Sequence, residues 1–317
     1  MLNVIIPTYK ARDTLPKALD SLVAQTKRKF FVTISQDGDG EDYSDIINEY
    51  KRRGLTIRLI NSPVNGGAGV ARQRGLDASK MFDYVMFLDA DDMFMPRATE
   101  VMYYEAKKTG ADIVMSNFIA ERNKIADIHF SSATAPITWT HNKIYRVGYL
   151  NSIGLRFPSN LRMNEDSYFN VVAVNCTENK KRIDEYTYIW RDNDHSITRE
   201  GNFFEKSWEQ YILGQIMGLG KILEIKGEVG PGLTAATLCL IYGHMMRAMY
   251  YQYSMDFIAP FLKILGRNEK IRKNFDNIKF WEMVGQELKA CEITEDEMIF
   301  YDMKFNVWLN KFILEKV

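Results

Sequence analysis

The sequence predicts an α/β fold in which helices cover a mostly parallel sheet and a helical region follows. Three observations support this prediction. Four short apolar runs alternate with three segments of helical period between residues 2 and 88, which is typical of parallel sheets with covering helices. The run YVMFL leads directly into the three acids of FLDADD (87–92), as expected where a buried parallel strand reaches the sheet edge. After residue 203, β-rich runs give way to Met, Leu, Tyr and Lys at helical spacing.

The elements follow from periodicity and from their terminating residues. Pro7 stops the first strand, Gly54 closes the second helix and Gly110 ends the fourth helix. The weak pattern of 120–160 predicts only loops and short strands. In order, the sequence predicts strand 2–6, helix 14–23, strand 30–34, helix 46–53, strand 55–60, helix 68–78, strand 84–88, helix 97–108, strand 112–118, helix 164–175 and strand 185–190. We expect a catalytic domain over 1–202 and a helical C-terminal domain over 203–317.

Composition argues for an ordinary globular protein rather than a nucleic-acid or membrane binder. Its 317 residues carry 41 basic and 41 acidic side chains, with 46% hydrophobic residues. Three widely separated cysteines, Cys176, Cys239 and Cys291, favour a reducing compartment. The N-terminal LNVIIP lacks the basic leader of a signal peptide and is interpreted as a strand. His244 and Arg247 interrupt the most apolar late stretch, so we expect no membrane span and a cytoplasmic protein.

Polar residues follow each of the first four strands: Pro7 to Tyr9, then Asp37, then 65–74, then Asp89 and Asp91. Carboxyl ends of parallel strands meet at one edge of a sheet, where open α/β folds bind ligands. Two carboxylates around one small residue suit a hard divalent cation that also takes substrate phosphates. The alternative is an acidic turn in which Asp92 caps the next helix.

Six segments in order resemble the family 2 glycosyltransferases of the GT-A fold, and together they cover roughly residues 1 to 200. They are PTYK (7–10), SLVAQT (21–26), QDGDG (36–40), NGGAGVARQRG (65–75), FLDADD (87–92) and MNEDSYF (163–169). The resemblance implies an inverting transferase that moves a sugar from a nucleotide-diphospho-sugar, usually UDP-linked, to an acceptor hydroxyl. It also implies a divalent metal, Mn²⁺ or Mg²⁺.

For the nucleotide, the resemblance implies a pocket lined by Pro7, Thr8 and Tyr9, with Thr8 hydrogen bonding and Tyr9 packing. Tyr9 is alternatively a core aromatic. Asp37 stands where the family's aspartate accepts the uracil imide N–H, and Gly67 belongs to a glycine-rich turn that lets the backbone approach a ligand.

The motif around Asp37 departs from the family's usual two acids followed by Gly-Ser. Gln36 precedes it, and Asp39 follows Gly38. For Asp39 and Glu41 we favour a solvated acidic turn.

For the diphosphate and metal, Arg72 matches an arginine that braces the donor and the metal-binding loop. Asp91 is the expected metal ligand, and Asp89 is expected at the ribose or sugar hydroxyls and at the metal. For Arg74 we favour a surface cation.

Inversion requires a base opposite the diphosphate. Glu165 and Asp166 occupy the family's Glu-Asp position, so Asp166 is the expected general base and Glu165 orients it or contacts the acceptor. The alternative is an acidic first turn of the following helix.

The segment YIWRDNDHSIT (188–198) resembles one that closes over the diphosphate. Arg191 would close over the diphosphate, and His195 would be an additional metal ligand. Ser196 would donate a hydrogen bond to a phosphate. For His195 the alternative is a surface residue. Trp139 is either a buried aromatic or a stacking surface for an acceptor sugar.

Two rival functions remain open on sequence alone: a sugar-1-phosphate nucleotidyltransferase and a non-catalytic sugar-nucleotide-binding protein. The expected acceptors are a glycan, a lipid-linked molecule, a protein or modified nucleic acid. The aromatic and Met residues of the C-terminal helices are typical of a core or an oligomer interface, and we expect this region to shape the acceptor side or to form a homo-oligomer contact.

Overall fold

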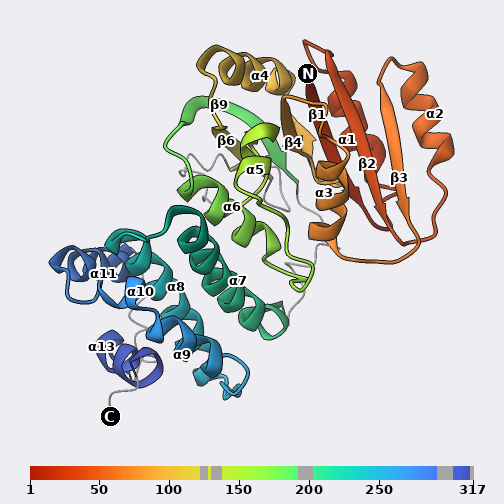
Figure 1. Cartoon of the computed structure of the whole chain (residues 1–317). Coiled ribbons are helices and arrows are strands. Elements are labelled where there is room, and N and C mark those ends of the chain that lie inside the picture. The colour runs from red at the N-terminus through yellow and green to blue at the C-terminus, as the bar shows by residue number, and fades with distance from the viewer. Residues whose placement is uncertain (122–127, 130–137, 192–202, 291–302, 315–317) are drawn as a thin grey trace. The chain divides into compact units, whose positions relative to one another are not determined.

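The computed structural model describes residues 1–121, 128–129, 138–191, 203–290 and 303–314. The chain divides into two compact units, Met1–Ser196 and Ile197–Val317 (Figure 1). The first unit is a nine-stranded sheet with covering helices, and the second is helical in its described parts. Of the described residues, no helix is long and apolar enough to cross a membrane.

Half of the sheet is parallel and matches the predicted alternation. Its strands are β1 (Leu2–Thr8), β2 (Phe30–Asp37), β3 (Ile57–Ser62) and β4 (Tyr84–Phe87), in the spatial order β3-β2-β1-β4. In register, Leu2 of β1 lies opposite Phe30 of β2 and Tyr84 of β4. The helices between them are α1 (Leu15–Val23), α2 (Ser44–Arg52) and α3 (Ala68–Asp77).

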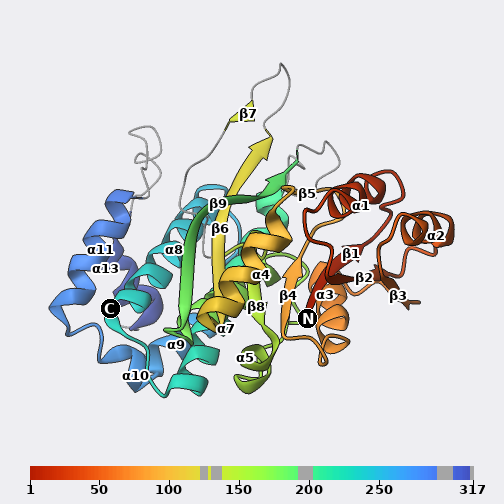
Figure 2. The same cartoon turned by 90° about the horizontal axis from the view of Figure 1, so that it is seen from above.

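The helices cover opposite faces of this half-sheet. Leu2, Val4 and Ile6 share a buried cluster with residues of α1, α2 and α4 (Ala98–Thr109). Ile5 points to the other face, where it lies against Gly75 of α3. Figure 2 shows α3 across β1 from α1. This alternation is the period of two expected of a strand buried on both faces.

The other half of the sheet is mixed and was predicted less well. The antiparallel strand β8 (Lys143–Arg146) lies between β4 and β6 (Ile113–Glu121), and β9 (Lys180–Trp190) pairs parallel to β6. The two-residue strand β5 (Met93–Phe94) pairs with β9, and β7 (Ile128–His129) pairs with β6. A short helix, α5 (Val147–Ser152), follows β8.

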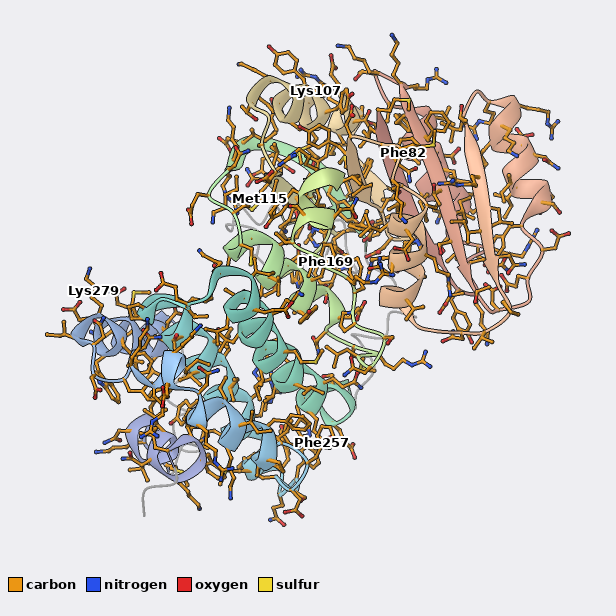
Figure 3. All side chains as sticks on the ribbon, viewed as in Figure 1. Phe82, Lys107, Met115, Phe169, Phe257 and Lys279 are labelled. Atoms are coloured by element: carbon orange, nitrogen blue, oxygen red, sulfur yellow. The ribbon has the colours of Figure 1, made fainter. Side chains whose placement is uncertain are left out.

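Helix α6 (Glu165–Asn175) is buried around most of its circumference, including every residue from Ser167 to Val174. Phe169, labelled in Figure 3, stacks on Phe157 at 4.0 Å between ring centroids and meets Phe87 of β4 edge to face. A helix that is buried around most of its circumference lies in the interior of its domain. The start of α6, which carries Glu165 and Asp166, is therefore fixed against the sheet.

The second unit packs aromatic and Met side chains between helices. Trp308 is fully buried and its indole N–H lies 3.3 Å from the sulfur of Met245. The chain approaches closely at Gly266, where an added Cβ would meet the carbonyl of Ile313. The elements are α7 (Phe203–Lys226), α8 (Pro231–Tyr250), α9 (Ala259–Arg267), α10 (Glu269–Arg272), α11 (Ile278–Ala290), α13 (Phe305–Trp308) and the π-helix η2 (Leu309–Ile313).

Candidate functional site

The carboxyl ends of β1, β2 and β4 place Thr8, Asp37 and Asp89 at one edge of the sheet. Thr8 lies in register with Gln36, the neighbour of Asp37, and the chain leaves β4 through Leu88, whose N–H donates to Ile5. Helix α3 starts at this edge, and its side chains join the separate strand ends.

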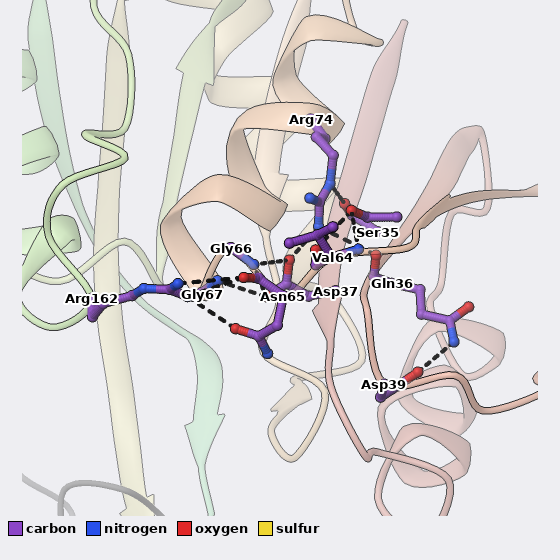
Figure 4. A network of polar contacts seen from close by, with 11 residues as sticks. Ser35, Gln36, Asp37, Asp39, Val64, Asn65, Gly66, Gly67, Arg74 and Arg162 are labelled. Carbon is purple, nitrogen blue, oxygen red and sulfur yellow. Dashed lines mark hydrogen bonds and ion pairs between the residues drawn. The ribbon is translucent and has the colours of Figure 1, made fainter.

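Asp37 is buried, and its carboxylate binds the turn that opens α3. Its oxygens accept the backbone N–H of Gly66 at 3.0 and 3.1 Å and that of Gly67 at 2.7 Å. Arg74 adds an ion pair at 2.5 Å (Figure 4). The favoured interpretation of Arg74 as a surface cation is therefore wrong, because its side chain is only 23% exposed and faces Asp37.

Asp39 organises the turn beyond β2. It accepts hydrogen bonds from the backbone N–H of Lys10, the side chain of Gln36 and the hydroxyl of Tyr43. Desolvation raises the pKa of Asp39, but these accepted hydrogen bonds outweigh it, and the pKa lies below its usual value. Asp39 is thus a structural acceptor rather than a solvated turn residue.

Tyr9 follows β1 and is 48% exposed, so it is not a core aromatic. The ammonium of Lys10 lies 5.4 Å from its ring centroid. The exposed ring leaves a surface on which a flat ligand can pack.

Arg72 of α3 connects two acids from distant parts of the chain. Its guanidinium donates to Asp89 at 2.7 Å and to Glu165 at 2.8 Å, with only 8% of its side chain exposed. Desolvation lowers the pKa of Arg72. The charges of Asp89, Glu165 and Asp166 raise it by a larger amount, so the pKa lies above its usual value. A buried cation in this position is permanently charged.

Asp92 does not cap the following helix. Arg97 occupies the N-cap position of α4, while Asp92 accepts the hydroxyl of Tyr188 at 2.6 Å and the backbone N–H of Arg191 at 2.8 Å. Burial, together with the nearby charges of Asp91 and Asp89, raises its pKa well above the usual value. Asp92 therefore joins the strand end to β9.

Asp89 and Asp91 are both partly exposed at the strand end. Within the described part of the chain, no group of three or more His, Cys, Asp or Glu side chains is placed to hold a metal. Their two carboxylates nevertheless fit Mg²⁺ or Mn²⁺, which bind through one or two carboxylates while substrate phosphates complete the coordination.

Two buried polar atoms at this edge have no hydrogen-bond partner among the described residues: Thr8 Oγ1 and Arg72 Nε. Buried polar groups are normally hydrogen-bonded, so these two atoms favour the binding of a polar ligand at this edge.

The acids at the start of α6 lie close to α3. An added Cβ on Gly69 would come within 2.4 Å of Glu165 Cγ, so the absent side chain at 69 lets Glu165 reach Arg72. Desolvation raises the pKa of Glu165 to about 7 against the opposing effect of Arg72. Burial also raises the pKa of Asp166, whose carboxylate accepts the backbone N–H of Ser167.

The remaining predicted residues lie farther along. The guanidinium of Arg191 is 3.3 Å from Glu121. His195 and Ser196 lie outside the described residues. Trp139 is partly buried and contacts His141 and Trp190, so the aromatic is part of a cluster rather than an open stacking surface.

Three contributors were not expected from the sequence: Arg74, Tyr188 and Arg162. Arg162 precedes α6 and donates to the side chain of Asn65 at 3.0 Å and to its carbonyl at 3.3 Å. The sequence offers no signal for these contacts, since each pairs residues that are distant along the chain.

Known proteins resemble the chain over both units. The family model described as glycosyl transferase family 2 matches residues 3–168. EpsJ, an uncharacterised glycosyltransferase of Bacillus subtilis, is 27% identical over 62% of this chain, and a poly(ribitol-phosphate) beta-glucosyltransferase of Bacillus spizizenii is 26% identical over 61%. These alignments span 63% and 33% of the two relatives.

The solved structure of Staphylococcus aureus TarS 1-349 in complex with UDP-GlcNAc is similar with a TM-score of 0.67. At 18% identity, the match covers 98% of this chain and 91% of that one. This likeness confirms the predicted GT-A fold followed by a helical region. Because the family model spans more than half of the sequence, the chain belongs to glycosyl transferase family 2.

Proposed function

We propose that the protein transfers a sugar from a nucleotide-diphospho-sugar, a UDP-sugar, to an acceptor hydroxyl with inversion at the anomeric carbon. One observation carries the proposal: Arg72 joins Asp89 of the strand-end acids to Glu165, the neighbour of Asp166. A donor-binding edge and a candidate base are thereby held together. The UDP-GlcNAc in the TarS complex supports the donor class.

On the donor side, the nucleotide would lie along the edge of β1 and the turn before α3, on Pro7, Thr8 and Tyr9. The unpartnered hydroxyl of Thr8 favours a polar ligand there. Arg72 and Arg191 would contribute positive charge near the diphosphate. The donor-side set also includes Asp37, Gly67 and Asp89, with His195 and Ser196 as untested additions.

A divalent cation on Asp91 and Asp89 would stabilise the negative charge that develops on the leaving diphosphate. The residues themselves would hold the donor in place and keep Asp89 oriented through Arg72.

On the acceptor side, Asp166 would act as general base. As the acceptor oxygen bonds to the anomeric carbon, the bond to the diphosphate breaks and the hydroxyl proton passes to the Asp166 carboxylate. The raised pKa of Asp166 makes its carboxylate a better proton acceptor. Glu165, held by Arg72, would fix the start of α6 from which Asp166 projects.

A donor panel tests the proposal. Isothermal titration with UDP, GDP and CDP in Mn²⁺ should show tightest binding of UDP, and UDP-sugars should release UDP faster when an acceptor is added. Poly(ribitol phosphate) is a reasonable first acceptor, given the name of the Bacillus spizizenii relative. Binding without turnover on any acceptor would favour a non-catalytic protein, and release of pyrophosphate from UTP and a sugar 1-phosphate would favour a nucleotidyltransferase.

For the region 203–317, we infer a domain that shapes the acceptor side or forms a homo-oligomer contact. Ile278 at the start of α11 is 73% exposed, which is unusual for a large aliphatic side chain. If α11 forms the contact, Ile278→Lys should lower the sedimentation coefficient of the full chain. Ile264→Lys on α9, where the wild-type residue is 65% exposed, is the matched control. If the wild type is monomeric, the proposed homo-oligomer contact is wrong, and a role of this region in shaping the acceptor side remains.

A further inference from the structure

Among the described residues, three N–H groups hold the carboxylate of Asp37, and it retains capacity for one more. Its oxygens share the amide of Gly66 at 3.0 and 3.1 Å, Oδ2 accepts from Gly67 at 2.7 Å, and Oδ1 accepts from Arg74 at 2.5 Å. A carboxylate offers about four lone-pair sites, so one remains for a ligand N–H. Asp37 can therefore accept a hydrogen bond from a base while the protein holds the carboxylate in place.

Of these three groups, only that of Arg74 belongs to a side chain, and it reaches the end of β2 from α3 (Figure 4). Its Nη2 donates both to Asp37 Oδ1 and to the carbonyl of Gln36 at 3.2 Å, and its Nε lies 3.5 Å from the hydroxyl of Ser35. One guanidinium nitrogen thus joins the carboxylate to the backbone of the strand that carries it. Because the guanidinium is planar and rigid, these contacts fix the carboxylate relative to β2.

The orientation of the carboxylate depends on this ion pair. Without Arg74, Oδ1 would keep only its share of the Gly66 amide, whereas Oδ2 would keep its contact with Gly67. The carboxylate could then turn about its bond to Cβ. The side chains of Asp37 and Arg74 are only 3% and 23% exposed, so salt and water screen their attraction much less than that of a surface pair.

We propose that Arg74 is a positioning residue that sets the selection of uracil over cytosine by fixing Asp37. The proposal rests on the UDP-sugar donor proposed above. N3 of uracil carries a proton that a carboxylate can accept, whereas N3 of cytosine is itself an acceptor and would face the carboxylate without a proton between them. A carboxylate held in one orientation rejects cytosine, because both acceptors stay unpaired. A carboxylate that can turn away discriminates less.

Arg74→Met tests the proposal, since it removes the guanidinium and keeps a long side chain. Isothermal titration in Mn²⁺ gives the ratio of the CDP to the UDP dissociation constant, which should fall by about tenfold relative to the wild type. Arg74→Lys keeps the charge without the rigid fork, so its ratio should lie between the two, and it serves if Arg74→Met does not fold. An unchanged ratio in the folded variants would overturn the proposal.

The matched control is Arg58→Met. Arg58 of β3 also binds a hydroxyl and a carbonyl, those of Thr33 at 3.2 Å and Ala78 at 2.9 Å, but it does so beyond the C-terminal end of α3. Its ratio of dissociation constants should equal that of the wild type. An equal fall in this control would trace the effect to the loss of any arginine on this half-sheet and contradict the proposal.

A double variant separates positioning from direct contact with the base. A residue that acts through Asp37 loses its influence once Asp37 is changed, so Arg74→Met added to Asp37→Asn should alter the ratio by less than about twofold. A further fall of about tenfold in the double variant would mean that Arg74 contacts the base itself, and positioning through Asp37 would be wrong.

A last readout needs no nucleotide. The Gly67 amide donates to the same carboxylate, so its hydrogen exchange should accelerate about tenfold in Arg74→Met but not in Arg58→Met. Unchanged exchange in a folded Arg74→Met would refute the positioning of Asp37. A wild type that binds UDP no more tightly than CDP would instead refute the proposed UDP-sugar donor, while the exchange result still decides whether Arg74 holds Asp37.

Discussion

The acids after β4 and the acids at the start of α6 share one arginine but differ in burial. Asp89 and Glu165 lie 2.7 and 2.8 Å from Arg72, yet the side chain of Asp89 is 32% exposed and that of Glu165 is 8% exposed. Desolvation raises the pKa of Glu165 to about 7 although Arg72 opposes the shift. Arg72 therefore pairs with two different kinds of acid. Asp89 is partly exposed and can contact a ligand, whereas Glu165 is buried and has a raised pKa.

Asp166 carries the largest expected effect on the α6 side of this comparison. Asp166→Asn should lower kcat by about 10²–10⁴-fold, because a general base acts only as the proton moves, while donor affinity stays within about twofold. Steady-state kinetics and titration with UDP measure the two quantities. An equal fall in affinity and kcat would make Asp166 structural and erase the distinction between the two acid groups.

Arg72→Met tests whether the two acid groups depend on one another. It removes the shared cation and leaves Glu165 buried without its ion-pair partner, so unfolding free energy should fall by about 3 kcal/mol. Urea denaturation measures the loss. Arg53→Met, which breaks an exposed pair with Asp20, is the control and should cost less than about 1 kcal/mol. Similar losses of unfolding free energy in both variants would show that the ion pairs of Arg72 with Asp89 and Glu165 contribute little to stability.

Asp91 carries the expected effect on the strand-end side. Asp91→Ala should weaken UDP binding in Mn²⁺ by about 100-fold and should remove the response to EDTA, because the metal would link this carboxylate to the phosphates. Calorimetry in Mn²⁺ and in EDTA gives both values. If the wild type bound UDP with the same affinity in EDTA as in Mn²⁺, the proposed metal site on the strand-end acids would be contradicted.

The smallest effect is a pH dependence of stability. The pKa of Glu165 rises from 4.5 to about 7 on folding, so its protonation stabilises the folded state below pH 4.5, and this contribution is lost as pH rises through about 7. Glu165→Gln stays neutral and should lack that loss. The stability of the variant minus that of the wild type should therefore be greater at pH 8 than at pH 5 in urea unfolding. A constant difference would contradict the raised pKa.

The alternating half of the fold was predictable because each element carries its own signal. The helix expected at 68–78 is α3, Ala68–Asp77, and the strand expected at 55–60 is β3, Ile57–Ser62. The mixed half lacked such signals. Strand β8 has four residues including Lys143, and β9 begins with KKRIDE, so both depend on partner strands rather than on local preference.

The candidate site divides in the same way. Strand-end positions such as Asp37 and Asp89 could be found from the sequence, because an apolar run that ends in an acid marks the edge of the sheet. The pairs that these residues form could not be found from the sequence. Arg74 pairs with Asp37 across 37 positions and Arg72 with Glu165 across 93, and no local sequence pattern indicates contacts over such separations.

The close approach at Gly69 has a consequence for how this site tolerates change. A single methyl group there would occupy space held by Glu165 Cγ, 2.4 Å away. A substitution that adds no charge and removes no hydrogen-bonding group would thus displace an acid of the candidate site. The position of Glu165 thus depends on the small volume of residue 69, which carries no reactive group. Substitutions along α3 are therefore limited by side-chain volume as well as by chemistry.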